Sequence, residues 1–447
     1  MDFNENSELP IGWAKAKLPD AIELIMGQSP SSSDCNSDGK GLPFYQGKTE
    51  FGKVYPTVRK YCTSPKKLAV KNDVLLSVRA PVGPTNLATE RCAIGRGLAV
   101  LRGNENVDFK YLFSYMRHIE PWLSEQGTGT TFKAVSGVFL KELDFYVAPL
   151  PEQKRIVEKL DSLLAQVETI QQRLNNLPDI IKRFRQSVLA AAVSGKLTEH
   201  WRNKTSIELP KQSCLKELGR IVGGKTPSKS RIAFWESGTI PWVSPKDMKV
   251  YEIAESMDLI TELAITEGGM KLVPKGSILM VTRSGILSHS FPVAVTTKDL
   301  TINQDIKAFI PDSRLITSHF AGVLMKGLSH RVLDECSKVG TTVSSVETSK
   351  LVNLKFDLPN LVEQVEIVRL VKQYFALADT LEKHLADAKT RVDNLTQSIL
   401  AKAFRGELVS QDPNDEPADK LLERIKTARL ETEKLEKAAK KAAKVKQ

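Results

Sequence analysis

One long internal repeat constrains this chain more than any other feature of its sequence. Residues 129–197 return as residues 340–408, shifted by 211 positions without a gap, and 22 of the 69 aligned positions are identical. A repeat of this length predicts an architecture that is built twice. Such a chain can present two equivalent surfaces, either to two copies of one partner or to a ligand that has two parts.

Each copy of the repeat contains a long helix whose apolar residues are spaced alternately four and three residues apart. In the first copy they are Ile156, Leu160, Leu163, Val167, Ile170, Leu174, Leu177, Ile181, Phe184 and Val188. In the second they are Ile367, Val371, Tyr374, Ala378, Leu381, Leu385, Ala388, Val392, Leu395 and Ile399. A mean spacing of 3.5 residues is typical of a coiled coil. We therefore predict two long antiparallel helices that pack on each other, ending at Gly195 and Gly406 because glycine commonly terminates helices.

The repeat divides the chain into five segments. Residues 1–150 and 209–360 are β-rich blocks broken by Gly, Pro and Ser, and Val74–Arg79 of the first resembles Ile278–Arg283 of the second. Residues 151–208 and 361–410 are the helical spacers, and residues 411–447 form a separate basic tail. Gly27 matches Gly224 at an offset of 197, so the second block carries about 14 extra residues. The predicted fold is α+β, with two similar globular domains separated by two antiparallel coiled-coil helices.

Composition narrows the class of protein. The chain carries a formal net charge of +11, which favours a polyanionic partner. Its five cysteines are scattered and odd in number, which argues against a disulfide framework or a structural zinc. No apolar run reaches membrane-spanning length and the first residues do not resemble a signal peptide, so we expect a cytoplasmic protein.

The sequence contains no motif that predicts catalysis. Residues 219–226 match the phosphate-loop pattern G-x-x-x-x-G-K-[ST], but that loop needs a buried strand before it and a helix after it. Here a polar turn follows Thr226, and the repeat counterpart near Gly27 lacks the lysine, so we do not expect nucleotide binding. The six histidines are isolated, which provides no metal-ligand spacing.

The order of motifs along the chain resembles that of a known protein family. The opening Leu9–Trp13 precedes a first block that runs through Pro149–Val157 into a heptad helix closed by Arg185–Leu189 and Gly195–Thr198, and the whole then repeats. This resembles the specificity subunit of Type I restriction-modification enzymes. Glu158–Val167 and Asn394–Leu408 look most similar to the enteric branch typified by the K-12 enzyme.

The resemblance implies a function and a set of partners. Each globular block would be a target-recognition domain that reads one half of a split site in double-stranded DNA, and the helices would hold the two apart. Two methyltransferase subunits would dock on the duplicated helices, and restriction and motor subunits would join through them. The chain itself would be non-catalytic, so S-adenosylmethionine, ATP and Mg²⁺ would belong to partner subunits, and a partner would flip the adenine that it methylates.

Polar and cationic residues on loops are the candidates for DNA contact, because base edges and phosphates are bound by these residue types. They are Gln28, Ser29, Arg79, Thr128, Thr130, Thr131, Lys133, Lys225, Thr226, Lys229, Arg283, Thr341, Thr342 and Ser344. An alternative is that the Ser and Thr residues only cap turns and each arginine pairs with an acid. The alternative functions are a free-standing DNA-binding protein or repressor, a phosphate-loop ATPase, and a coiled-coil scaffold.

Overall fold

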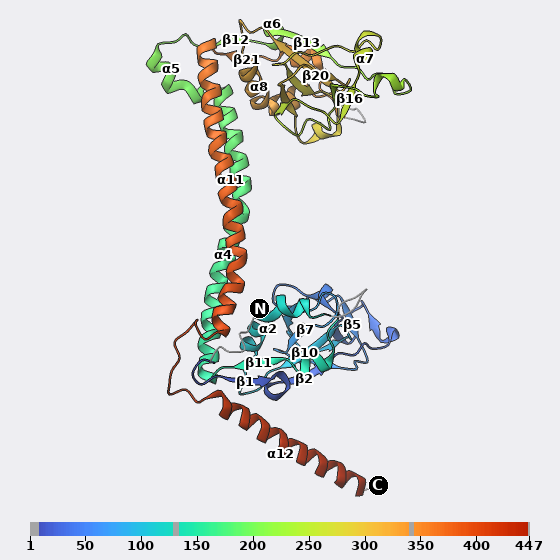
Figure 1. The fold of residues 1–447 in the computed structure, drawn as a ribbon, viewed down its shortest axis with the longest axis vertical. Helices are drawn as coiled ribbons and strands as arrows, with labels where there is room; N and C mark the ends of the chain where they lie inside the picture. Colours follow the sequence, from blue (N-terminus) through green and yellow to red (C-terminus); the bar gives the residue numbers. More distant parts are fainter. Residues whose placement is uncertain (1–8, 128–133, 339–343, 446–447) are drawn as a thin grey trace. The chain divides into compact units, whose positions relative to one another are not determined.

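The computed structural model describes residues 9–127, 134–338 and 344–445 (Figure 1). The chain forms two compact units: residues 1–173 with 388–447, and residues 174–387. We call them the first and the second unit. Each contains one globular domain and part of each of two long helices.

The domain of the first unit begins with strand β1 and ends with strand β11, and these two strands pair in antiparallel orientation. Its elements are β1 (Ala14–Lys17), α1 (Leu18–Ala21), β2 (Glu23–Met26), η1 (Ser32–Asp34), β3 (Cys35–Asn36), β4 (Leu42–Tyr45), η2 (Lys48–Glu50), β5 (Lys60–Cys62), β6 (Leu68–Ala69), β7 (Val74–Ser77), β8 (Thr85–Leu87), β9 (Cys92–Ile94), β10 (Leu98–Arg102), α2 (Phe109–Glu125), α3 (Gly137–Lys141) and β11 (Asp144–Val147).

The domain of the second unit is likewise closed by a pair of antiparallel strands, β12 and β21. Its elements are β12 (Lys211–Ser213), α6 (Leu215–Leu218), β13 (Gly219–Gly223), η4 (Ile232–Phe234), β14 (Ile240–Val243), β15 (Glu252–Ile253), β16 (Asp258–Ile260), α7 (Glu262–Thr266), β17 (Ile278–Val281), η5 (Gly285–Ser288), β18 (Val293–Thr296), β19 (Thr301–Ile302), β20 (Ile306–Pro311), α8 (Ser318–Gly327), α9 (Ser329–Cys336), α10 (Thr348–Asn353) and β21 (Phe356–Leu358).

The two domains share the topology of their main sheet. In the first domain the strand order is β2-β10-β7-β8, and in the second it is β13-β20-β17-β18, extended by β15. Strands β7 and β17 are buried along their whole length, as expected for the apolar runs that looked alike in the sequence. The predicted pair of similar β-rich domains is therefore confirmed.

The two long helices have equivalent bounds. Helix α4 spans Leu150–Val193 and helix α11 spans Leu361–Phe404, 44 residues each and separated by the 211-residue offset of the repeat. Gly195 and Gly406 follow the two helices with φ of 73° and 74°, a left-handed conformation that glycine adopts without steric cost. The helix ends predicted from these glycines are confirmed.

Within each unit the two helices run antiparallel, and part of the predicted apolar seam lies between them, where Phe184 of α4 contacts Tyr374 of α11. Gln171 bonds Asp393 in the first unit, and Arg185 bonds Asp379 and Glu382 in the second. Most seam residues of one heptad position are buried: Leu160, Val167, Ile181 and Val188 on α4, and Val371, Ala378, Leu385 and Val392 on α11. At the other heptad position burial varies: Ile156 and Ile367 are buried, whereas Ile170, Leu381 and Leu395 are exposed. The expectation that the whole seam packs between these two helices is corrected at the three exposed positions, which we call the apolar stripe.

Each domain packs against the first turns of one long helix and the last turns of the other. Ile156 and Leu400 belong to the core of the first unit, whereas Ile367 and Val188 belong to the core of the second. Apolar burial of this kind supplies the main favourable free energy of folding. Because both helices bury residues in this way in both units, the two helical segments align with each other without a gap.

The repeated Glu-Gln pair has a structural role in both units. Gln153 accepts a hydrogen bond from the Asp108 amide at 2.9 Å, directly before α2, and Gln364 accepts one from the Thr317 amide at 2.8 Å, directly before α8. Each glutamine side chain also donates to a carbonyl just before its own helix, Ala148 or Pro359. The pair therefore ties the first turn of each long helix to its domain.

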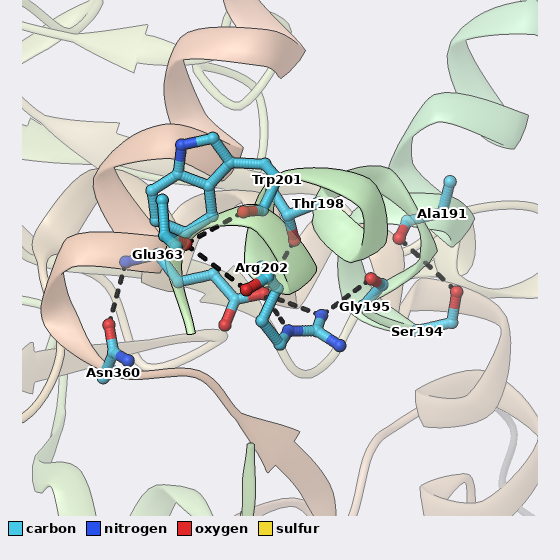
Figure 2. Close-up of polar contacts among 9 residues, drawn as sticks. Ala191, Ser194, Gly195, Thr198, Trp201, Arg202, Asn360 and Glu363 are labelled. Atoms are coloured by element: carbon cyan, nitrogen blue, oxygen red, sulfur yellow. Dashed lines mark hydrogen bonds and ion pairs between the residues drawn. The ribbon is translucent and has the colours of Figure 1, made fainter. Parts of the chain in front are cut away.

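The preceding glutamates are buried too, with different partners. In the first unit, Trp13 Nε1 donates to Glu152 Oε2 at 3.0 Å, and burial raises the pKa of the Glu152 carboxyl. In the second unit, Glu363 Oε1 accepts from Thr198 Oγ1 at 2.7 Å and from Arg202 Nε and Nη2 at 2.9 and 2.7 Å (Figure 2). Thr198 and Arg202 come from η3 (Lys196–Thr198) and α5 (Glu199–Thr205).

The C-terminal segment is not separate along its whole length, in contrast to the expectation of a tail. Helix α12 (Ala418–Val445) buries Ala418, Leu421 and Ile425 in the core of the first unit. Arg429 donates from its guanidinium group to the carbonyls of Pro19 and Ile22 at the end of α1. The apolar residues that recur three and four positions apart explain this docking, because they form one face of the helix.

Candidate nucleic-acid interface

In the first domain, three backbone hydrogen bonds bring the candidate loops together. The amide of Gln28, just after β2, donates to the Ile94 carbonyl at 3.2 Å, and the Val78 amide donates to the Gly97 carbonyl at 2.9 Å. The Val135 amide donates to the Val78 carbonyl at 3.0 Å. The loop after β2, the β9–β10 turn, the end of β7 and the segment around Val135 therefore meet in one place.

The second domain repeats this arrangement bond for bond. The Lys225 amide donates to the Ile302 carbonyl at 3.0 Å, and the Thr282 amide donates to the Asp305 carbonyl at 2.8 Å. The Val346 amide donates to the Thr282 carbonyl at 2.8 Å. We call the shared cluster of four segments the loop frame. It is present once in each domain.

The matched glycines explain how the loops approach so closely. A Cβ at Gly27 would overlap the Gly95 carbonyl oxygen, and a Cβ at Gly224 would overlap the Asn303 carbonyl oxygen. Glycine is therefore required at both positions because the β9–β10 turn and its counterpart touch the backbone there. The sequence match at these two positions marks the same packing constraint.

Of the candidates in the first domain, Gln28, Ser29 and Arg79 lie in its loop frame. Gln28 and Arg79 are exposed, and Arg79 forms a backbone bridge with Ala134. Ser29 Oγ accepts a hydrogen bond from the Arg96 amide at 3.3 Å. The Arg96 side chain is exposed at the tip of the β9–β10 turn and is not among the candidates predicted from the sequence. The signal was the Gly95-Arg96-Gly97 turn, which presents a cation between two small residues.

Of the candidates in the second domain, Lys225, Thr226, Arg283 and Ser344 lie in the second loop frame. Lys225 Nζ donates to the Gly268 carbonyl at 3.0 Å, and Thr226 Oγ1 bonds the Gln304 side chain. The exposed Arg283 donates its amide to the Asp305 carbonyl at 3.2 Å, and the Ser344 carbonyl accepts from the Ser284 amide at 3.1 Å.

Two further positions complete the comparison. Lys229 is exposed in the turn that follows Thr226. Gln304 is exposed at the tip of the β19–β20 turn, where Arg96 stands in the first domain, and was also missed. The remaining candidates lie outside the described residues: Thr128, Thr130, Thr131, Lys133, Thr341 and Thr342.

The segment that matches the phosphate-loop pattern does not have the geometry of such a loop. Residues Gly219–Gly223 form an edge strand, β13, and no helix follows Thr226 directly. The Lys225 amide and ammonium groups both donate to carbonyls of the same domain. The backbone amides here therefore do not form a phosphate cradle at a helix N-terminus.

The described part of the chain offers neither a metal site nor a membrane-spanning helix. It contains no group of three or more His, Cys, Asp or Glu side chains placed to hold a metal ion. Nor does it contain a helix that is both long enough and apolar enough to span a membrane.

Comparison with known proteins identifies the family. The chain is 32% identical to the EcoKI specificity subunit of Escherichia coli K12 and 30% identical to the StySPI specificity subunit of Salmonella potsdam. Both alignments cover 94% of this chain and 96% of the relative. The fold is similar to that of the HsdS subunit from Thermoanaerobacter tengcongensis, with a TM-score of 0.59 at 19% identity over 90% of this chain and 99% of that one.

The family model for the Type I restriction modification DNA specificity domain matches twice, at residues 10–179 and 209–388. Each match covers one loop frame and most of one long helix. The chain therefore belongs to the family of Type I restriction-modification DNA specificity subunits.

Proposed function

We propose that this chain is the DNA-reading subunit of a Type I restriction-modification complex and that each loop frame reads one half of a split target. The observation that carries the proposal is the duplication of the loop frame with different side chains on it. Arg96 and Gln304 occupy the same tip in the two frames. Arginine pairs with guanine and glutamine with adenine in the major groove, so the two frames suit different bases.

The frames also carry cations suited to phosphate. Arg79 and Arg283 are exposed at equivalent positions after β7 and β17, and neither forms an ion pair among the residues that the structure describes. Unpaired guanidinium groups can bind DNA phosphates and so fix the position of the domain on the duplex. The polar side chains at the neighbouring turns can then contact base edges.

The exposed apolar stripe of the long helices is the proposed docking surface for two methyltransferase subunits. Ile170 of α4 and Leu381 of α11 are equivalent in the repeat, and 41% and 46% of their surfaces are exposed. Leu377 adds to the stripe in the second unit, with half of its surface exposed. Apolar seam positions left open by two helices are suited to additional helices from partners.

In this proposal the partner subunits carry out methyl transfer and DNA cleavage. The methyltransferase subunits would bind S-adenosylmethionine and flip the target adenine, and motor-nuclease subunits would use ATP and Mg²⁺. The chain described here would be non-catalytic. Its contribution is to select the DNA sequence and to join the two methyltransferase copies.

The test compares two single substitutions in the complete complex. Arg96→Ala should relax base preference in one half-site only, and Gln304→Ala should relax it in the other half-site only. Each lost bidentate contact costs roughly 1–3 kcal/mol of discrimination. Sequencing of methylated adenines in cells that express each complex gives the readout. A change in both half-sites from either substitution would contradict the proposal.

A further inference from the structure

The second domain has an open cleft of about 560 Å³ beside its loop frame. Its lining includes Lys229, Trp235, Trp242, Lys246, Asp258 and Asn303. Asp305, whose carbonyl accepts from the Arg283 amide, also lines it. The cleft is therefore continuous with the surface proposed to meet DNA, and its volume lies in the range of small-molecule sites.

Both tryptophans that line this cleft have their indole N–H groups bonded within the domain. Their ring centroids lie 5.3 Å apart at an interplanar angle of 86°. Trp235 Nε1 donates to the Ser228 carbonyl at 3.1 Å, and Trp242 Nε1 donates to the Lys225 carbonyl at 3.0 Å. Trp235 is half-buried and Trp242 is buried, so Trp235 has the more accessible ring.

Four charged residues line the cleft, and of these the Asp305 carboxylate accepts from the Asn303 and Gln304 side chains. Lys229, Lys246 and Asp258 are exposed, and within the described ranges none of their side chains forms an ion pair or a hydrogen bond. An unpaired lysine is suited to a phosphate. An unpaired carboxylate accepts from an exocyclic amino group, as on cytosine or adenine.

The first domain differs at both aromatic positions. Phe44 pairs with Ala93 in its sheet as Trp242 pairs with Thr301, so Phe44 and Trp242 are equivalent. Cys35 directly follows η1, and Trp235 directly follows η4. The tryptophan pair is therefore a feature of the second domain, which indicates a role in one half-site.

We propose that this cleft holds one nucleobase that has left the base stack, in the half-site read by the second domain. The inference rests on the function proposed above. An aromatic ring in a concave site reaches the face of a base only if that base leaves the duplex stack. Trp235 supplies the ring face, Lys229 and Lys246 bind the flanking phosphates, and Asp258 favours a base with an exocyclic amino group.

The experiment uses the full chain in complex with its methyltransferase partners and measures affinity for duplexes that carry the recognised site. Trp235→Ala and Trp235→Leu should each weaken binding by about 5- to 150-fold, the range for loss of one base–aromatic stack. Trp235→Phe keeps a ring but loses the bond to Ser228, and should bind like wild type. Trp122→Ala, a half-buried tryptophan of the first domain, is the matched control and should leave the second half-site unaffected.

A scan of single abasic positions then locates the base. At one position in the second half-site, the abasic substitution should abolish the difference between wild type and Trp235→Ala. Equal losses for Trp235→Phe and Trp235→Ala would show that the indole N–H fastens the loop, and would overturn the inference. So would wild-type binding by Trp235→Leu, or a scan without such a position. A wild-type complex that binds no specific sequence would instead overturn the proposed function, and the inference with it.

Discussion

Arg202→Met should strongly destabilise the second unit, because it leaves a buried carboxylate without its cation. The Glu363 side chain has no exposed surface, and the Arg202 side chain is 11% exposed. Two of the three hydrogen bonds to Glu363 Oε1 come from Arg202, and Oε2 has no partner among the described atoms (Figure 2). Removing one member of a buried ion pair typically costs about 3–5 kcal/mol.

The free energy of unfolding is measured in urea by far-ultraviolet circular dichroism. Adding Glu363→Gln to Arg202→Met removes the buried charge, so the double variant should be less destabilised than the sum of the two single variants. Trp13→Phe in the first unit removes a neutral donor, not a cation, from the Glu152 carboxylate and should cost less, roughly 1.5–3 kcal/mol. A loss below about 1 kcal/mol for Arg202→Met, or strict additivity in the double variant, would refute the reasoning.

Three further predictions follow from the helices, a buried histidine and the rejected phosphate loop. Seven residues inserted at matched points in α4 and α11 keep the seam in phase and add about 10 Å of helix, so gel-shift binding to the original site should fall. Undiminished binding would show that the helices do not set the spacing. Burial lowers the pKa of His118 to about 4, so unfolding free energy should fall by up to about 3 kcal/mol as pH drops from 6.5 to 4. Urea titrations should show no such slope for His118→Gln. The pure chain should not hydrolyse ATP, and hydrolysis that Lys225→Ala abolishes would contradict this.

The architecture could be predicted from the sequence wherever a local pattern of residues indicated which positions are buried or where a helix ends. The 3.5-residue spacing and the terminal glycines predicted both long helices, since each of these signals is local. The seam was over-predicted because periodicity identifies apolar positions and not the element that covers them. Leu381 satisfies the pattern and yet stays exposed.

The loop frame was only partly predictable. The glycine match at Gly27 and Gly224 signalled a shared constraint, but the carbonyls that impose it lie in turns about 70–80 residues away in sequence. Arg96 and Gln304 were missed because one exposed residue in a tight turn leaves no periodic signal. The docking of α12 was missed for another reason: its charged composition obscured one apolar face, formed by Ala418, Leu421 and Ile425.

The two domains are proposed to read DNA independently, one half-site each. This independence is tested most directly by replacing residues 1–150 with the equivalent block of a relative that has a different target. The hybrid is expressed with its methyltransferase subunits, and methylated adenines are mapped across the genome by single-molecule sequencing. We expect a new sequence in one half of the methylated site and an unchanged sequence in the other. A change in both halves, or in neither, would contradict it.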